Sequence, residues 1–174
     1  VALALGAGAT FVARSVDTDL AHLGSVLARA AAHKGTAFVE VLQNCIVFND
    51  GAYSTLTDKA TRDDARVLLE DGKPLVFGKA RDKGIRLRGL EPEVVALGDG
   101  GVDESELIVH DEKAAHSGLA FFLSQLDTPG LPVPLGVFRS VLQPTYGELN
   151  AQLHADALAA KGRGNLADLM RSGD

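Results

Sequence analysis

Residues 10–42 constrain the fold most, because they have the pattern of a strand, a helix and a second strand in that order. Residues 11–16 are rich in β-forming types and predict the first strand. Residues 36–42 are apolar at nearly every position, which is typical of a strand buried on both faces of a parallel sheet. The helix between them predicts one right-handed βαβ unit and therefore an α/β fold.

The predicted helix has a start, an apolar stripe and a stop. Asp17 or Thr18 is placed to cap its first turn, and Gly35 supplies the left-handed stop. The stripe that we expect to face the sheet recurs at helical spacing and consists of Leu20, Leu23, Leu27 and Ala30 or Ala31.

Cys45 is the only cysteine, and it lies three residues after the predicted second strand. Ligands of open α/β sheets bind beyond the carboxyl ends of the strands, so Cys45 is expected in a loop at the functional edge. Three interpretations are open: a small buried hydrophobe, a nucleophile that needs a nearby base, or a metal ligand. No Cys–His signature is present, and one thiolate does not complete an iron–sulfur site. Spacing alone favours the first.

The opening residues contain a glycine pattern that does not predict a nucleotide site. A strand over 1–5 followed by Gly6 and Gly8 resembles the start of a dinucleotide-binding turn, but Phe11 stands at the third glycine position and a strand follows instead of a helix. We expect a helix end over residues 1–5, capped by Gly6 or Gly8.

The remainder of the chain does not alternate strands and helices regularly. We therefore expect an α/β domain over residues 1–53 and an irregular α+β extension over residues 54–174. Its expected elements are a helix over 63–70, short strands over 75–78, 94–97, 107–110 and 135–141, a helix over 114–126, and a helical tail over 145–170 interrupted at 162–164.

Composition excludes several classes of protein. A net charge of −6 argues against a generic nucleic-acid binder. No apolar run approaches the roughly 18 residues of a membrane span. A single cysteine cannot form an internal disulfide, which favours a reducing, cytoplasmic location. The chain opens on Val1, already within a predicted element, which predicts a processed N-terminus or a piece of a longer protein.

The stretch LALGAGATFVARSVDTDLAHLGSVLARAAAHKGTAFVEVLQNCIVFNDGAY carries a specific resemblance. It is similar to the C-terminal half of the thiamine-diphosphate-binding β subunit of 2-oxoacid:ferredoxin oxidoreductases, nearest to the 2-oxoglutarate type. Later pieces fit the same subunit, namely GKPLVFGKARDKGIRL, LIVHDE and PLGVFRSVLQPTYGEL. QNCIVFND is the most specific of these segments.

The resemblance implies cofactors that this chain could hold only in part. Such β subunits bind thiamine diphosphate through Mg²⁺ on a GDGD…N motif and carry three cluster cysteines in the N-terminal half. Neither feature is found in these 174 residues. The fourth cysteine of the family's 4Fe–4S cluster matches Cys45. The resemblance thus implies a partner α subunit and a missing N-terminal half of the β subunit.

For the intact enzyme the resemblance implies oxidative decarboxylation of a 2-oxoacid, here 2-oxoglutarate. The acyl group passes to coenzyme A, and electrons pass through the cluster to ferredoxin. This chain alone is expected to be inactive. Two alternatives stay open: half of another thiamine-diphosphate-dependent decarboxylase or dehydrogenase that has no cluster, and a non-catalytic docking module.

Two charged segments have less specific interpretations. The basic stretch Lys79–Arg88 is expected to be a solvated or intersubunit face, with an acidic ferredoxin or coenzyme A phosphates as alternative partners. Residues 109–112 look like a metal or acid–base cluster. Successive side chains of an extended segment point to opposite faces, so a polar strand end is the preferred interpretation.

Overall fold

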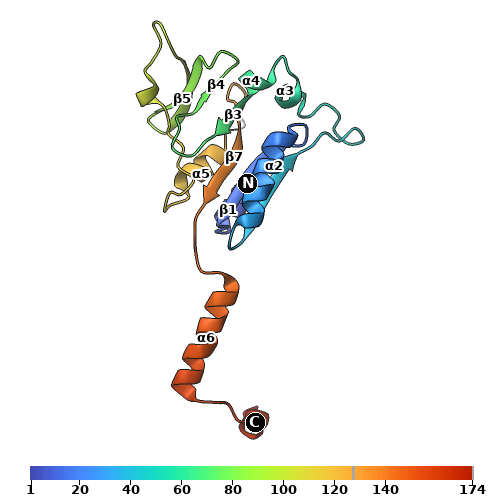
Figure 1. Cartoon of the computed structure of the whole chain (residues 1–174), viewed down its shortest axis with the longest axis vertical. Coiled ribbons are helices and arrows are strands. Elements are labelled where there is room, and N and C mark those ends of the chain that lie inside the picture. Colours follow the sequence, from blue (N-terminus) through green and yellow to red (C-terminus); the bar gives the residue numbers. More distant parts are fainter. Residues whose placement is uncertain (127, 174) are drawn as a thin grey trace. The chain divides into compact units, whose positions relative to one another are not determined.

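A computed structural model describes residues 1–126 and 128–173 (Figure 1). The chain divides into two compact units, Val1–Leu142 and Gln143–Asp174. No helix in the described part of the chain is long and apolar enough to cross a membrane. The division falls far from the expected boundary after residue 53, because strands on both sides of that boundary share one sheet.

The main sheet has four strands in the order β2-β1-β7-β3. β1 (Phe11–Val16) runs parallel to β2 (Ala37–Leu42) and antiparallel to β7 (Val133–Ser140), while β3 (Arg66–Leu69) runs parallel to β7. Helix α2 (Leu20–Ala32) connects β1 to β2. The predicted βαβ unit and the α/β class are confirmed.

The predicted burial of the second strand on both faces is wrong. β2 lies at the end of the sheet, and no described strand follows it. As a result Phe38 and Val41, which lie on opposite faces, each keep 40 % of their surface exposed. The sequence of an interior strand thus stands at a sheet edge.

The predicted stripe of α2 is wrong in part as the packing face, since only Leu23 and Ala30 of its members are half-buried. Val26 is buried and Ala30 is half-buried against the sheet, whereas Leu20 and Leu27 are 77 % and 47 % exposed. The cap is Asp19, whose carboxylate accepts from the His22 backbone N–H at 3.2 Å, and not Asp17 or Thr18. α2 thus packs on the sheet through Val26 and Ala30 and leaves Leu20 and Leu27 exposed.

The predicted stop at Gly35 is wrong in position, because α2 ends at Ala32 with His33 as its C-cap. Two residues after that cap, in the turn before β2, comes Gly35. Its φ of +131° lies in the region that favours glycine, and a Cβ there would stand 2.6 Å from Oγ1 of Thr10. The helix expected at the start of the chain is confirmed as α1 (Ala2–Gly6), but its C-cap is Ala7 and not Gly6 or Gly8.

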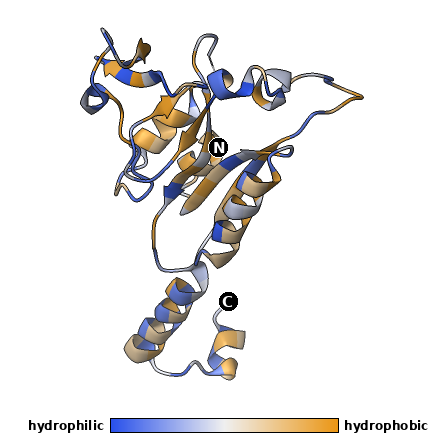
Figure 2. Cartoon of the chain, turned by 45° about the horizontal axis from the view of Figure 1, so that its top comes forward, coloured by the Kyte–Doolittle hydropathy of each residue, from blue (hydrophilic) through white to orange (hydrophobic). Residues whose placement is uncertain are grey.

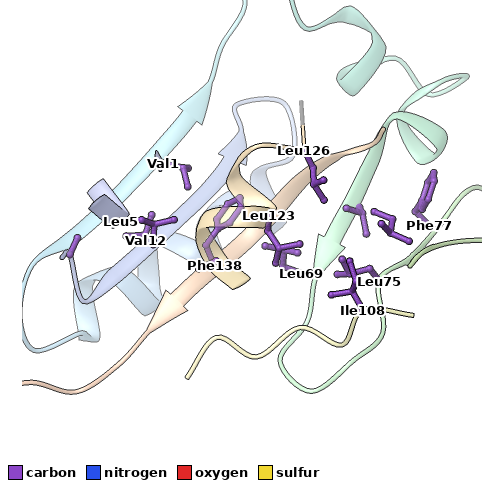
Figure 3. Packing of buried hydrophobic residues seen from close by; sticks show 14 residues of the cluster. Val1, Leu5, Val12, Leu69, Leu75, Phe77, Ile108, Leu123, Leu126 and Phe138 are labelled. Carbon is purple, nitrogen blue, oxygen red and sulfur yellow. The ribbon is translucent and has the colours of Figure 1, made fainter. Parts of the chain in front are cut away.

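The larger core lies on the sheet face opposite α2 and extends under the second sheet (Figure 3). α1 and α5 (Gly118–Ser124) contribute to it, and Val12, Leu123 and Phe138 have no exposed surface. This core joins residues from both sides of the expected boundary, which explains why residues 1–142 form one unit.

The second sheet is antiparallel, in the order β4 (Val76–Phe77), β5 (Lys83–Arg88) and β6 (Glu91–Ala96). The predicted helix over 63–70 is wrong in part, since α4 (Arg62–Ala65) gives way at once to β3. Residues 107–110 form only isolated bridges instead of a strand, and the helix expected over 114–126 is shortened to α5. The remaining short helices are α3 (Ser54–Thr57) and η1 (Glu104–Glu106).

The second unit consists of α6 (Tyr146–Lys161) and α7 (Leu166–Arg171), as the sequence predicts. Thr145 and Glu148 form a reciprocal capping box at the start of α6, and Gly162, with φ of +73°, ends it. Hydrophobic and hydrophilic residues are mixed along these helices (Figure 2). Neither helix contains a buried residue.

Candidate functional site

Cys45 lies in the loop between β2 and α3, beyond the carboxyl end of β2. It is exposed and not in a disulfide. Its carbonyl oxygen accepts from the backbone N–H of Asn49 at 2.9 Å, and the two residues form an isolated antiparallel bridge. The expected loop position is confirmed, and the interpretation as a small buried hydrophobe is wrong.

The side chain of Asn44 closes this loop. Its Nδ2 donates to Oδ1 of Asp50 at 2.9 Å, and its Oδ1 accepts from the Gly51 backbone N–H at 2.8 Å. Gly51 has a φ of +75°, which glycine adopts without strain. Both side-chain contacts span the turn, so the loop has a defined shape in this chain alone.

The loop backbone favours the thiolate form of Cys45. The N–H groups of Phe48 and Val47, with a smaller contribution from Asn49, lower the pKa of the Cys45 thiol below its ordinary value. The thiolate is the form that binds metals and attacks electrophiles. The sulfur is therefore exposed, prepared for ligation and held on a closed loop.

The tip of the same loop is apolar and exposed. Ile46, Val47 and Phe48 have 78 %, 76 % and 90 % of their surface accessible. Figure 2 shows hydrophobic colouring at this tip, where the loop reaches away from the sheet. Contiguous apolar surface of this kind marks a contact site for another molecule.

A second polar group gathers at the carboxyl end of β1. Oγ of Ser15 lies 2.7 Å from Nδ1 of His22, and Nη1 of Arg66 lies 3.3 Å from Oδ2 of Asp19. Burial lowers the pKa of His22, against the opposing charge of Asp19. The sequence assigns His22 only to a helix and does not predict its contact with Ser15. The pattern that indicates this contact is the separation of seven residues between the two across a strand-to-helix turn.

The described residues place no histidine base beside Cys45, so its interpretation as a nucleophile has no support. Within residues 1–126 and 128–173, no hydrogen bond joins a histidine to its side chain. The same residues contain no group of three or more His, Cys, Asp or Glu side chains that could hold a metal ion. Cys45 can thus supply one ligand, but not a complete site.

The polar run at 109–112 does not converge, as expected. His110 is fully buried and its Nε2 lies 2.8 Å from the carbonyl oxygen of Val137, while its Nδ1 has no partner. Glu112 is buried and pairs with Arg29 at 2.5 Å. These side chains have separate structural partners.

The basic stretch Lys79–Arg88 is partly neutralised. Lys83 pairs with Asp64 at 2.8 Å, and Arg86 pairs with both Glu93 and Glu106. A cleft of about 570 Å³ beside it is lined by residues of both signs, among them Lys73, Lys79, Arg81, Asp63, Glu70 and Glu104. This mixture favours the solvated or intersubunit interpretation over a purely basic docking face.

Comparisons with known proteins place the chain in a family. No family model matches it. It is 40 % identical over 149 residues to 2-oxoglutarate oxidoreductase subunit KorB of Mycobacterium tuberculosis, a match that covers 85 % of this chain and 39 % of KorB. It is 46 % identical over 50 residues to 2-oxoacid:ferredoxin oxidoreductase β subunits of Saccharolobus solfataricus and Aeropyrum pernix, covering 29 % of this chain and 16 % of each subunit.

The chain thus spans well under half the length of these curated relatives. The match to KorB extends over most of the 174 residues and agrees with the resemblance of the QNCIVFND segment. The chain belongs to the 2-oxoacid:ferredoxin oxidoreductase β subunits and corresponds to the C-terminal part of such a subunit.

Proposed function

We propose that the chain works as part of the β subunit of a 2-oxoacid:ferredoxin oxidoreductase and that Cys45 is one thiolate ligand of its 4Fe–4S cluster. The observation that carries this proposal is the exposed thiol on a closed loop whose amides lower its pKa. The location beyond the carboxyl end of β2 agrees with the general placement of ligands in α/β sheets.

The donor set fits one cluster ligand and no more. A 4Fe–4S cluster takes four thiolates as a rule. The chain has one cysteine, so the other three ligands come from outside these 174 residues. The sequence has no GDGD…N motif, and no acidic cluster in the described part of the chain replaces it. The residues present therefore do not fit thiamine diphosphate and Mg²⁺, which we assign to the rest of the enzyme.

When bound, the cluster supplies one-electron transfer toward ferredoxin. The residues of this chain position and tune it. The backbone N–H groups of Phe48 and Val47, which lower the pKa of the Cys45 thiol, would act on the cluster through this sulfur, since hydrogen bonding around the sulfurs is one of the factors that set a cluster's reduction potential. When another part of the enzyme covers them, the exposed apolar side chains of Ile46–Phe48 would exclude water from the cluster. The lower local dielectric would then change the reduction potential of the cluster.

The substrate assignment rests on the family. KorB is named a 2-oxoglutarate oxidoreductase, and we infer the same 2-oxoacid here, with coenzyme A as acyl acceptor and ferredoxin as electron acceptor. The β-subunit names also support an α subunit as partner. The cytoplasmic location rests on the single cysteine alone. The alternatives are a thiamine-dependent enzyme without a cluster and a docking module without activity.

The test compares visible and EPR spectra of the anaerobically purified complex, with wild-type chain, Cys45→Ser and Asn49→Ala. The expected result is iron–sulfur absorption that bleaches on adding 2-oxoglutarate, survives in Asn49→Ala, and is lost or degraded in Cys45→Ser. A cluster unaltered by Cys45→Ser contradicts the ligand assignment. A complex that contains thiamine diphosphate but no iron supports the thiamine-dependent enzyme without a cluster. A complex that contains neither thiamine diphosphate nor iron supports the docking module.

A further inference from the structure

We propose that a pocket on the face of the main sheet opposite α2 binds a carboxylate group, and that Arg14 recognises it. The pocket has a volume of about 380 Å³ and lies where β1, β2 and α3 meet. The carboxylate belongs either to a small organic acid with an apolar body or to an acidic side chain of another part of the enzyme. Cys45 does not line this pocket, so the proposal rests on neither the cluster nor the 2-oxoacid.

The floor of the pocket comes from two neighbouring strands. Arg14 of β1 and Glu40 of β2 are partners in the parallel ladder, and both line the pocket. Their neighbours Ala13 and Val39 pack with α2 on one face of the sheet. Because successive side chains of a strand point to opposite faces, Arg14 and Glu40 lie on the other face.

Arg14 is a charged side chain held inside the protein. Only 9 % of its surface is exposed. Its Nε donates to Oε2 of Glu40, and its Cζ stands 5.5 Å from the centroid of the fully buried Phe138 ring. Contact with the face of an aromatic ring suits the flat guanidinium. These two neighbours fix the orientation of the guanidinium through its Nε and its plane.

The two Nη groups of Arg14 have no hydrogen-bond partner among the described residues. They keep accessible surface, because the described side-chain atoms that lack both a partner and such surface belong to Arg62 and His110. Glu40 does not serve them, since its Oε2 accepts from Nε and its Oε1 accepts from the nitrogen of Val1 at 3.1 Å. Buried charged groups as a rule have hydrogen-bond partners. The open Nη pair therefore indicates a missing acceptor.

The Nη pair selects a planar anion of low charge. A guanidinium presents parallel N–H donors at the spacing of the two oxygens of a carboxylate. A phosphate dianion would lie beside the Glu40 carboxylate, and among the described lining residues Arg14 is the only cation. A carboxylate adds a single negative charge and is therefore the better match.

The rest of the lining suits a small apolar body. Leu42, Leu56 and Val133 contribute alkyl side chains. Tyr53 and Thr55 bring hydroxyl groups to the wall, and a hydroxyl can donate to a carboxylate oxygen. Ligand pockets combine a mostly apolar lining with a few polar groups, and the volume lies near the lower end of their usual range of about 300–1,000 Å³.

The first test titrates the 174-residue chain with isovalerate, a branched carboxylate, and with isovaleramide, its uncharged analogue of similar shape. The chain has two tyrosines and no tryptophan, so in the Tyr146→Phe background its fluorescence comes from Tyr53 in the pocket wall. We expect saturable quenching by isovalerate and at least about tenfold weaker binding of isovaleramide, because the amide accepts no charge-assisted hydrogen bond. Equal affinities, or no saturable binding of isovalerate, would overturn the proposal.

Two variants and a matched control connect this binding to the pocket. Arg14→Lys keeps a cation beside Glu40 but loses the planar fork, and should weaken isovalerate binding at least about tenfold. Ala52→Phe, at an exposed lining position, should fill the pocket and abolish binding. Ala60→Phe makes the same exchange at an exposed residue outside the lining and should bind as wild type does. Unchanged affinity in Arg14→Lys or in Ala52→Phe would place the ligand elsewhere and overturn the proposal.

Saturation-transfer NMR with isovalerate on the assembled complex distinguishes the two sources of the carboxylate. A signal that Ala52→Phe abolishes and Ala60→Phe keeps identifies a free organic acid as the ligand. Without that signal, the enzyme itself fills the pocket, and a cryo-EM structure of the complex should show an acidic side chain at hydrogen-bond distance from the Nη groups of Arg14. Any other group there would overturn the proposal. Cys45→Ser should bind isovalerate as wild type does, so failure of the cluster assignment and failure of this site are distinguishable.

Discussion

The side-chain amide of Asn44 donates a hydrogen bond to the Asp50 carboxylate across 2.9 Å, and this contact closes the loop that carries Cys45. Asn44→Ala removes it together with the contact to Gly51. We expect the loop to open and the pKa of Cys45 to rise toward that of an ordinary thiol. The pH dependence of alkylation by iodoacetamide measures this, with Asn49→Ala as control. An unchanged profile would show that the backbone holds the loop without Asn44.

The backbone N–H of Phe48 is the largest cause of the lowered pKa of Cys45. Phe48→Pro deletes this donor, whereas Phe48→Ala keeps it and removes the exposed ring. We expect the pH midpoint of alkylation to move upward in Phe48→Pro and to stay near the wild-type midpoint in Phe48→Ala. Equal midpoints in the two variants would exclude the amide as the cause.

Burial of His110 makes stability depend on pH. Burial lowers its pKa below the ordinary 6.5, so the unfolded chain binds a proton more readily than the native chain. The stability contributed by neutral His110 is complete above 6.5 and is lost as the pH falls through the native value. Urea unfolding at about pH 7.5 and about pH 5.5 should show a smaller decrease for His110→Gln than for wild type.

Burial also lowers the pKa of His22, so this histidine affects stability in the same direction over this pH range. His22→Gln is therefore the matched control that measures its share. The two histidines lie in different surroundings, so their contributions should add. If His110→Gln keeps the full pH dependence, the buried imidazole does not cause it.

Gly136 lets β7 approach β3 closely. Its φ is +129°, and a Cβ there would lie 2.9 Å from the backbone oxygen of Leu69. Gly136→Ala should therefore lower the free energy of unfolding by about 1–3 kcal/mol. Gly118→Ala, at a helical position with open space around the added carbon, should be neutral or stabilising. Chemical denaturation of both variants checks the difference.

The sequence predicts the β1-α2-β2 unit because its determinants are local. Helical spacing, an acidic residue before α2 and Gly35 after it all lie within one segment. Which face of α2 meets the sheet was not predictable from spacing, since Leu20 and Val26 belong to two apolar faces of one helix. The edge position of β2 depends on neighbours elsewhere in the chain, and no local pattern records them.

The sequence does not predict elements that form only by pairing with residues far away in the chain. β3 follows a charged segment and exists because its residues pair with β7, more than sixty positions away. At the site, the loop position of Cys45 was predictable from the end of the strand. The contacts of Asn44 with Asp50 and of Ser15 with His22 were not, because residue types alone do not show which side chains meet across a turn.

The absence of buried residues in α6 and α7 has a thermodynamic consequence. A segment without a core of its own has no all-or-none transition, and its order follows helix–coil statistics, in which nucleation is costly and the ends fray first. Heating should therefore melt residues 143–173 gradually, while residues 1–142 unfold in a sigmoidal step. The magnitude of the far-UV ellipticity of the chain should decrease steadily with temperature well before its near-UV signal changes.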